Sequence, residues 1–440
     1  MLDVGRHPNI ELLAYSEVES LAGEAGNFTA TIRRKARFVE ESKCTGCGAC
    51  TEKCPVLVAD DFNVGLSSRH AVYSYFAQGI PSTHTIDAQY CRQKNDKKCG
   101  ICVKMCQAEA INFDQEDRVI EINIGAVIIA SGYEVFNPNK IPEYGYKKIP
   151  NVITALEFER LLSASGPTHG HLSRPSDLSF KTEYEELKKS IDKAKKTLER
   201  LEEKHGLKSE DVSTTPSDDE ERKEWVEKFK AFQKNTASLV TMEAKVKETK
   251  VAERLAFVQC VGSRDFRFYP FCSSYCCMHA IKEAIIAHEH GANTTSTVFG
   301  MDIRAVGKGF EEYKIRGGNN SNITYVRGRV AEINEADNHN PVIVYEDTRE
   351  RVVKSEEFDM VVLSTACAPS EGIESLAKIL GVELNEFGFF QTDPVQPLDT
   401  TRDGVYVCGC AHSPMDIPES VAQASSAAAR AVELVLSKSA

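Results

Sequence analysis

The segment Cys44-Thr-Gly-Cys47-Gly-Ala-Cys50-Thr-Glu-Lys-Cys54-Pro55 carries four cysteines at the spacing C-x2-C-x2-C-x3-C-P. Three thiolates this close together can bind three irons of one [4Fe-4S] cluster, whereas the fourth cysteine of such a run binds a second cluster. The segment therefore predicts two clusters, and it requires a second group of cysteines elsewhere in the chain.

The second group is Cys91-x7-Cys99-x2-Cys102-x3-Cys106, which repeats the ending of the first with a longer initial gap. Crossed ligation then predicts two ligand sets: Cys44, Cys47, Cys50 and Cys106 for cluster one, and Cys91, Cys99, Cys102 and Cys54 for cluster two. Zinc is the alternative, but it prefers ligands in two pairs. Gln107 stands where ferredoxins have a proline after the last ligand, which affects only the loop. We expect an inserted ferredoxin-like 2[4Fe-4S] α+β domain over residues 38–117.

The composition narrows the class of protein. The 440 residues are 42% hydrophobic and carry a net charge of −12, which argues against a nucleic-acid partner. Fifteen cysteines in tight spacings are typical of metal ligands or redox thiols in an intracellular protein. The sequence has no apolar run of membrane-spanning length and no signal-peptide pattern at its start. We therefore expect a cytoplasmic protein with no transmembrane segment.

Two strand-end patterns are similar to those of two-dinucleotide-binding-domain flavoproteins of the thioredoxin-reductase type. The apolar strand before Ser131 ends in Ala-Ser-Gly, which resembles their A-T-G turn, and Thr401–Ala411 resembles the strand beside the flavin ribityl chain. A helix with Pro418 at its first position follows, and its N-terminus could approach a flavin. The alternative is a buried strand–helix unit of any α/β domain. The expected flavin contacts are Ser131, Gly132, Gly409, Cys410, Ala411, Ile417, Ser420 and Val421.

The pyrophosphate-binding part of such a domain is missing from the sequence, because no G-x-G-x-x-G occurs in it. We interpret residues 1–37, 118–177 and 356–440 as parts of one FAD-binding domain that lacks its front third. FAD would then be shared with a partner chain.

Residues 254–355 are interpreted as a degenerate NAD(P)-binding-like domain. Its first turn, 260–271, is too long and bulky to hold a pyrophosphate, and four cysteines replace it at the start of a helix: Cys260, Cys272, Cys276 and Cys277. The partial positive charge of a helix N-terminus lowers thiol pKa values. A third [4Fe-4S] cluster, a redox dithiol and inert buried thiols remain as alternatives.

Four further side chains near these patterns receive simpler assignments. His279 is expected on the surface of the helix, Cys367 in the core and Cys408 on the packed face of its strand, while Cys410 could touch a flavin.

The charged segment 178–253 has no cysteine and shows two helical seams, Tyr184 to Leu201 and Trp225 to Val246, in which apolar side chains recur at three- and four-residue spacing. The seams predict a helical hairpin insertion. It is either a partner-binding arm or an insertion whose helices pack only on each other.

Together these segments closely resemble the HdrA-type iron–sulfur flavoprotein of heterodisulfide reductases. The resemblance is carried by Asp3–Ile10, the Cys44 run, Ser165–Pro167, His171–Pro175, Cys260–Asp265, Tyr275–Met278, Cys408–Ala411 and Asp416–Val421. It implies an iron–sulfur flavoprotein subunit of an oxidoreductase complex from an anaerobe. In that family the quartet Cys260, Cys272, Cys276 and Cys277 holds a cluster. The FAD performs electron bifurcation, in which one electron goes to ferredoxin and the other to a disulfide. The departures are the absent dinucleotide fingerprint and the charged hairpin.

The resemblance also implies partners, and it leaves alternatives open. The partners would be other subunits of a heterodisulfide-reductase-type complex, including hydrogenase- or formate-dehydrogenase-linked proteins and ferredoxin, with a homodimer inside the complex as a further option. No residue of this chain is assigned as catalytic. The alternative function is a flavin-free electron-relay module of a related complex, of the benzoyl-CoA reductase or quinone-linked sulfate-reduction type. A truncated gene model is a third explanation for the missing fingerprint.

Overall fold

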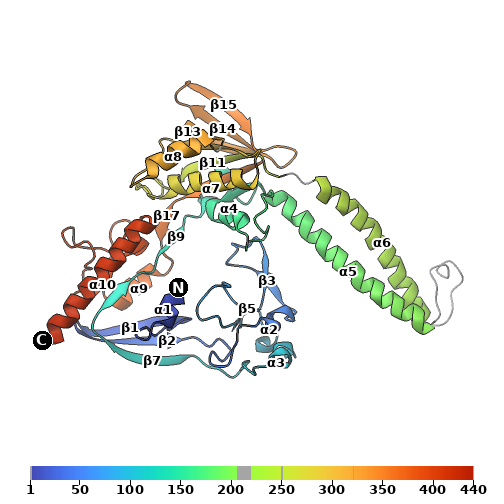
Figure 1. The fold of residues 1–440 in the computed structure, drawn as a ribbon, viewed down its shortest axis with the longest axis horizontal. Coiled ribbons are helices and arrows are strands. Elements are labelled where there is room, and N and C mark those ends of the chain that lie inside the picture. The colour runs from blue at the N-terminus through green and yellow to red at the C-terminus, as the bar shows by residue number, and fades with distance from the viewer. Residues whose placement is uncertain (1, 206–219, 249–250, 321, 440) are drawn as a thin grey trace.

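The computed structural model describes residues 2–205, 220–248, 251–320 and 322–439. Figure 1 shows a sheet domain covered by helices, a second region that contains the cysteine-rich module, and a long helical hairpin that projects away from both. None of the described helices combines the length and apolarity needed to cross a membrane.

The sheet domain is built on seven strands. In spatial order they are β10 (Val152–Thr154), β16 (Met360–Thr365), β11 (Arg254–Val261), β12 (Thr295–Gly300), β13 (Ile323–Glu335), β14 (Pro341–Asp347) and β15 (Val352–Glu357). The first five are parallel, and β13, β14 and β15 form an antiparallel meander. Strands β11 and β16 are buried at nearly every position because both faces of the sheet are covered.

Alternate side chains of β11 face different layers. Leu255 and Phe257 pack toward the helices α4 (Ala155–Leu162), α7 (Cys276–His290) and α8 (Phe310–Asn320). Ala256 and Val258 belong instead to a core formed with the meander side of the domain. Helix α4 begins with a capping box, in which Thr154 accepts from the amide of Glu157 and the Glu157 carboxylate accepts from the amide of Thr154.

The sheet extends beyond the segment 254–355 expected for this domain. Strand β10 and helix α4 come from the expected FAD-binding segment 118–177, and β16 comes from the segment 356–440. The reason is the parallel pairing of β16 with both β10 and β11, which places β16 inside the sheet.

The second region contains several small sheets. Its elements are α1 (Leu2–Arg6), β1 (Ser16–Glu24), β2 (Asn27–Arg34), β7 (Arg118–Ile124), β8 (Val127–Ile129), β9 (Tyr133–Val135), β17 (Cys367–Pro369), α9 (Ile373–Leu380), β18 (Val405–Val407), the short helix η5 (Gly409–Ala411) and α10 (Ile417–Ser439). Strands β1, β2 and β7 form an antiparallel sheet, β8 and β18 form a parallel pair, and β9 pairs with β17. Helix α10 lies against β8 and β18. Strands β1 and β2, which precede residue 38, form an antiparallel hairpin.

The cysteine-rich module has little regular structure. Its elements are α2 (Ala49–Glu52), β3 (Leu57–Ala59), β4 (Ser68–His70), β5 (Val72–Tyr73), β6 (Thr85–Ile86), η1 (Gln93–Asn95) and α3 (Ile101–Met105). Cysteines are a large part of its core: Cys50, Cys91 and Cys102 are buried beside Val72 and Ile86.

The hairpin consists of α5 (Pro175–His205) and α6 (Glu220–Glu248), which pack on each other. From the predicted seams, Ile191 and Leu198 are buried, and Trp225 is buried and stacked on Phe229 with ring centroids 5.2 Å apart. Helix α5 begins at Pro175, three residues before the expected boundary. The mixed α/β scaffold with an inserted cysteine-rich module and a helical hairpin is therefore confirmed.

Candidate redox centre

The structure brings the four cysteines predicted for cluster two around one small cavity. Cys54, Cys91, Cys99 and Cys102 all line it, together with Val72 and Phe113 among other residues. Burial, together with a smaller effect of the neighbouring sulfurs of Cys91 and Cys99, raises the pKa of the Cys102 thiol to about 11. Four sulfurs in an apolar enclosure favour a bound cationic group over free thiolates.

The cysteines predicted for cluster one lie at the edge of the same core. Cys50 is buried, Cys44 and Cys106 are partly buried beside it, and Cys47 is exposed. The Cys106 sulfur accepts a hydrogen bond from the amide of Ala110 at 3.3 Å. Burial raises the pKa of Cys50, whereas a hydrogen bond from the amide of Ala49 lowers that of Cys47.

The third quartet gathers at the N-terminus of α7. Cys276 and Cys277 occupy its first turn, and both interact electrostatically with Cys260 and Cys272. Burial raises the pKa of Cys276 to about 12 and that of Cys277 to about 11. We expected the helix N-terminus to lower these thiol pKa values. Burial outweighs that effect, because the apolar surroundings disfavour a free thiolate more than the partial charge of the helix favours it.

Sulfur spacing distinguishes the two metal chemistries considered for these quartets. A tetrahedral zinc site with Zn–S bonds of about 2.3 Å needs sulfurs about 3.8 Å apart. Among the described residues, no three cysteine sulfurs lie within 4.8 Å of one another. The quartets are therefore spread more widely than a single zinc ion requires.

Polar groups from the surrounding loops reach the sulfurs of the third quartet. Arg264 hydrogen-bonds to Cys260 and is held by Asp302, with Nη1–Oδ1 at 2.5 Å. The amide of Ser274 donates to the Cys272 sulfur at 3.4 Å. Donors of this kind stabilise negative charge on ligating sulfurs and tune reduction potential.

The loop after β11 folds back on itself and does not form a phosphate cradle. Ser263 and Tyr269 are bridged, and Phe268 packs edge-on against Phe136 with ring centroids 5.0 Å apart. Gly262 has φ of +83°, and a Cβ there would lie 2.4 Å from the Phe136 ring. Aromatic rings therefore fill the space that a glycine-rich turn leaves for pyrophosphate in a dinucleotide site.

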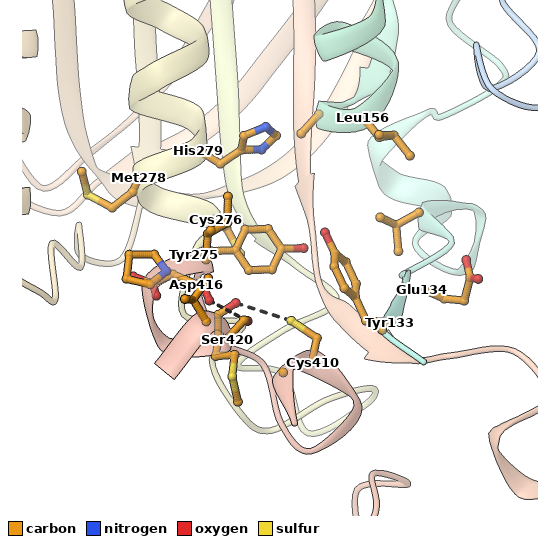
Figure 2. A pocket seen from close by; sticks show the side chains of 18 of the residues that line it. Tyr133, Glu134, Leu156, Tyr275, Cys276, Met278, His279, Cys410, Asp416 and Ser420 are labelled. Carbon is orange, nitrogen blue, oxygen red and sulfur yellow. Dashed lines mark hydrogen bonds between the residues drawn. The ribbon is translucent and has the colours of Figure 1, made fainter. Parts of the chain in front are cut away.

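A cavity of about 940 Å³ lies between α7, β9 and the start of α10 (Figure 2). Six of the eight residues expected to contact flavin line it, namely Gly132, Gly409, Cys410, Ile417, Ser420 and Val421. Cys276 also lines the cavity, so the third quartet reaches its wall. The volume is in the range of ordinary cofactor sites.

The other two expected contacts are not among the residues that line the cavity. Ala411 is fully buried in the core around Phe390, because η5 turns its side chain inward. The Ser131 hydroxyl accepts a hydrogen bond from that of Ser370 at 3.4 Å. Pro418 is the second residue of α10, not the first, because the helix already begins at Ile417.

The start of α10 is held by its own side chains. Asp416 accepts from the amide of Glu419 at 2.9 Å, and the Glu419 carboxylate accepts from the amide of Asp416 at 3.1 Å. Gln423 accepts from the amide of Gly409 at 3.0 Å and so ties η5 to the helix. These contacts hold η5 and the first turn of α10 together at the cavity wall.

Cys367 and Cys410 form a thiol pair beside the cavity. The Cys367 thiol hydrogen-bonds to Cys410, which lowers the pKa of Cys410 to about 6 and raises that of Cys367. Cys367 is buried, as expected, but this contact makes it more than a packing residue. Cys408 is also buried, and burial raises its pKa.

Several polar groups of this region were not found from the sequence. Tyr133 and Tyr275 face each other at the cavity with ring centroids 5.7 Å apart (Figure 2). His279, expected on the helix surface, lines the cavity and lies beside Glu159 and Glu283. A signal was present for Glu283, because a charged residue interrupts the apolar face of α7.

Comparisons with known proteins agree with the cysteine patterns. Residues 38–58 match the family model described as 4Fe-4S binding domain. The chain is 37% identical over 435 residues to the HdrA-type protein of the ferredoxin:CoB-CoM heterodisulfide reductase of Methanosarcina acetivorans, covering 98% of this chain and 48% of that protein. It is 37% identical over 434 residues to the corresponding protein of the H(2):CoB-CoM heterodisulfide,ferredoxin reductase of Methanothermobacter marburgensis, covering 98% and 54%.

The chain spans about half the length of the curated relatives it matches. Among solved structures, it is similar to thioredoxin reductase of Lactococcus lactis, with 19% identity and a TM-score of 0.30 over 42% of this chain and 54% of that one. The thioredoxin reductase of T. acidophilum gives 20% identity and the same TM-score, over 42% and 53%.

Proposed function

From the finding that this chain is a homologue of the HdrA-type proteins of heterodisulfide reductases, we propose that it is an iron–sulfur flavoprotein subunit that transfers electrons inside such a complex. The observation that carries the proposal is the third cysteine quartet at the wall of a cofactor-sized cavity. A metal cluster next to a cavity lined by expected flavin contacts gives electrons a short route between the two groups.

We assign three [4Fe-4S] clusters to the quartets named above. The eight cysteines of the module bind two of them with crossed ligands, and Cys260, Cys272, Cys276 and Cys277 bind the third. The wide sulfur spacing supports a cubane over a zinc ion in each quartet. The raised thiol pKa values support ligation as well, because bound iron compensates the negative charge that burial disfavours.

The cavity is assigned to the isoalloxazine end of FAD, which exchanges electrons singly or in pairs when bound. Gly132 and Gly409 lack side chains and allow close approach, and both have positive φ. The residues that would contact the ring system are Cys410, Ile417, Ser420 and Val421. No G-x-G-x-x-G occurs in the 440 residues. We propose that a partner chain of the complex contributes the loop that binds the FAD pyrophosphate.

We also propose an activity for the complete assembly. We infer an oxidoreductase component that is active within a complex in the cytoplasm, with ferredoxin and other subunits of a heterodisulfide-reductase-type complex as partners. We further propose electron bifurcation at the FAD and, as one option inside the complex, a homodimer of this chain.

Iron and flavin analysis of the anaerobically purified chain and its complex tests the proposal. We expect about 12 irons per chain, four for each of three clusters. FAD should be extractable from the complex and absent from the chain alone. About eight irons would remove the third cluster. Flavin in neither sample would support the flavin-free relay module instead.

A further inference from the structure

Three side chains of types that can bind metal ions lie together at the interface of α4 and α7. The proposed redox centre does not use them. They are Glu159 on α4, and His279 and Glu283 on α7. His279 and Glu283 are four residues apart and therefore share one face of the helix. One ligand atom from each of the three lies within 4.8 Å of the other two.

The distances approach those of a first-row divalent cation site. The His279 Nε2 atom is 3.6 Å from a Glu159 carboxylate oxygen and 3.5 Å from a Glu283 carboxylate oxygen. Metal–ligand bonds of about 2.0–2.2 Å with angles near 90–109° separate ligand atoms by about 2.9–3.5 Å. Small side-chain movements would bring all three atoms to this separation.

Glu283 provides the second, independent observation. Its side chain is 0% exposed, and neither carboxylate oxygen has a hydrogen-bond partner in the part of the chain that the structure describes. Burial of an ionised carboxylate without a partner is strongly unfavourable, so the group must be neutralised by a proton or by a cation. Burial and the nearby Glu159 carboxylate both raise its pKa.

The cavity gives an ion access to these side chains, and Lys282 competes with the ion for Glu159. Glu159 and His279 line the 940 Å³ cavity, and Figure 2 shows His279 at its wall, so an ion could enter there and keep coordination positions open to the cavity. Lys282 competes, because its ammonium group contacts the Glu159 carboxylate at 2.5 Å.

We propose that Glu159, His279 and Glu283 bind one divalent cation of the Mn²⁺, Fe²⁺ or Zn²⁺ class at the wall of the cavity. One imidazole and two carboxylates are a hard to intermediate donor set that suits these ions. The thiolates of the cysteine quartets, by contrast, are soft ligands. The inference requires neither flavin nor clusters.

Mn²⁺ is the probe that tests this site, because it favours oxygen ligands over thiolates. The full chain with its iron–sulfur clusters intact is titrated with Mn²⁺ under anaerobic conditions, and free Mn²⁺ is followed by EPR. We expect one bound Mn²⁺ per chain, and at least 10-fold weaker binding in Glu283→Gln and in Glu159→Gln. Glu289→Gln is the matched control, since this exposed glutamate lies on the same helix.

A variant that is expected to strengthen Mn²⁺ binding provides a further test. Lys282→Met removes the competing ammonium group and should tighten Mn²⁺ binding. Glu159 is partly exposed, so Glu159→Gln preserves the test if Glu283→Gln fails to retain its clusters. Absence of bound Mn²⁺, or equal binding by Glu159→Gln, Glu283→Gln and Glu289→Gln, would overturn the proposal and leave Glu283 as a protonated buried acid.

Discussion

The two cysteine-bearing regions are built in opposite ways. In the module at residues 38–117, Cys50, Cys91 and Cys102 are themselves core residues, and the two α-helices there are four and five residues long. At α7, a large core exists without the cysteines, because Ala280 and Ala284 pack in the core that contains Phe257. Clusters would therefore support the fold in the module, whereas in the sheet domain the fold supports the cluster.

The largest expected effect is loss of the module after removal of a predicted cluster ligand. Cys102→Ala should unfold residues 38–117 while the sheet stays intact, because helices as short as α2 and α3 are unstable without added constraints. Hydrogen exchange measured by mass spectrometry should show lost protection in the module and unchanged protection in β11 and β12. The control is Cys408→Ala, which removes a buried thiol outside the quartets. Retained protection in the module would contradict the comparison.

The corresponding change in the sheet domain should leave the fold intact. Cys276→Ser should remove about four irons and one EPR signal, with the protection of β11 and β12 preserved because the core around Phe257 does not depend on the cluster. Iron analysis and EPR check the loss, again against Cys408→Ala. An unchanged iron content would show that Cys276 is not a cluster ligand. Unfolding of the sheet would show that this domain, like the module, depends on its cluster.

These regions also differ in what the sequence could predict. The crossed sets, such as Cys54 with Cys91, Cys99 and Cys102, follow from short spacings that reflect cluster geometry directly. The proximity of Glu159 and Glu283 does not follow from any spacing in the sequence. The two residues meet through the packing of two helices that the hairpin separates along the chain. The place of strand β16 inside the seven-stranded sheet escapes prediction for a related reason, since parallel strands pair across long connections that leave no local pattern.

A third contrast concerns protonation near the cavity, where burial raises the pKa of Cys276 but a hydrogen bond from Cys367 lowers that of Cys410 to about 6. The Cys410 thiolate therefore predominates above pH 6 and is lost as the pH falls through that value. Alkylation by iodoacetamide, followed by mass spectrometry on the flavin-free chain, should show a midpoint at about pH 6. Cys367→Ala removes the hydrogen bond and should move the midpoint upward by more than about one pH unit, toward about 8.5. An unmoved midpoint would mean that Cys367 does not control this thiol.

The smallest expected effect concerns the loop that carries Cys260. Gly262→Ala should lower the free energy of unfolding by about 1–3 kcal/mol, since its positive φ is strained for alanine and its Cβ meets the Phe136 ring. Gly309→Ala is the matched control, with φ of +82° and open space around the Cβ position, and it should cost about 1 kcal/mol. Denaturant midpoints compare the two, and equal losses would show that the Phe136 contact does not fix the loop.

The parallel pair β8–β18 has a consequence for how long a bound group stays in the cavity. Each strand has three residues, and β8 pairs with no other strand among the described residues. So short a pair has few hydrogen bonds of its own, and the buried side chains of Ile129, Val405 and Val407 therefore contribute most of its resistance to local opening. Strand β8 leads to Gly132 and β18 leads to Gly409, so local opening of the pair would move two residues that line the cavity. We therefore expect the residence time of a bound group to depend on how often this pair opens locally, with no global unfolding required.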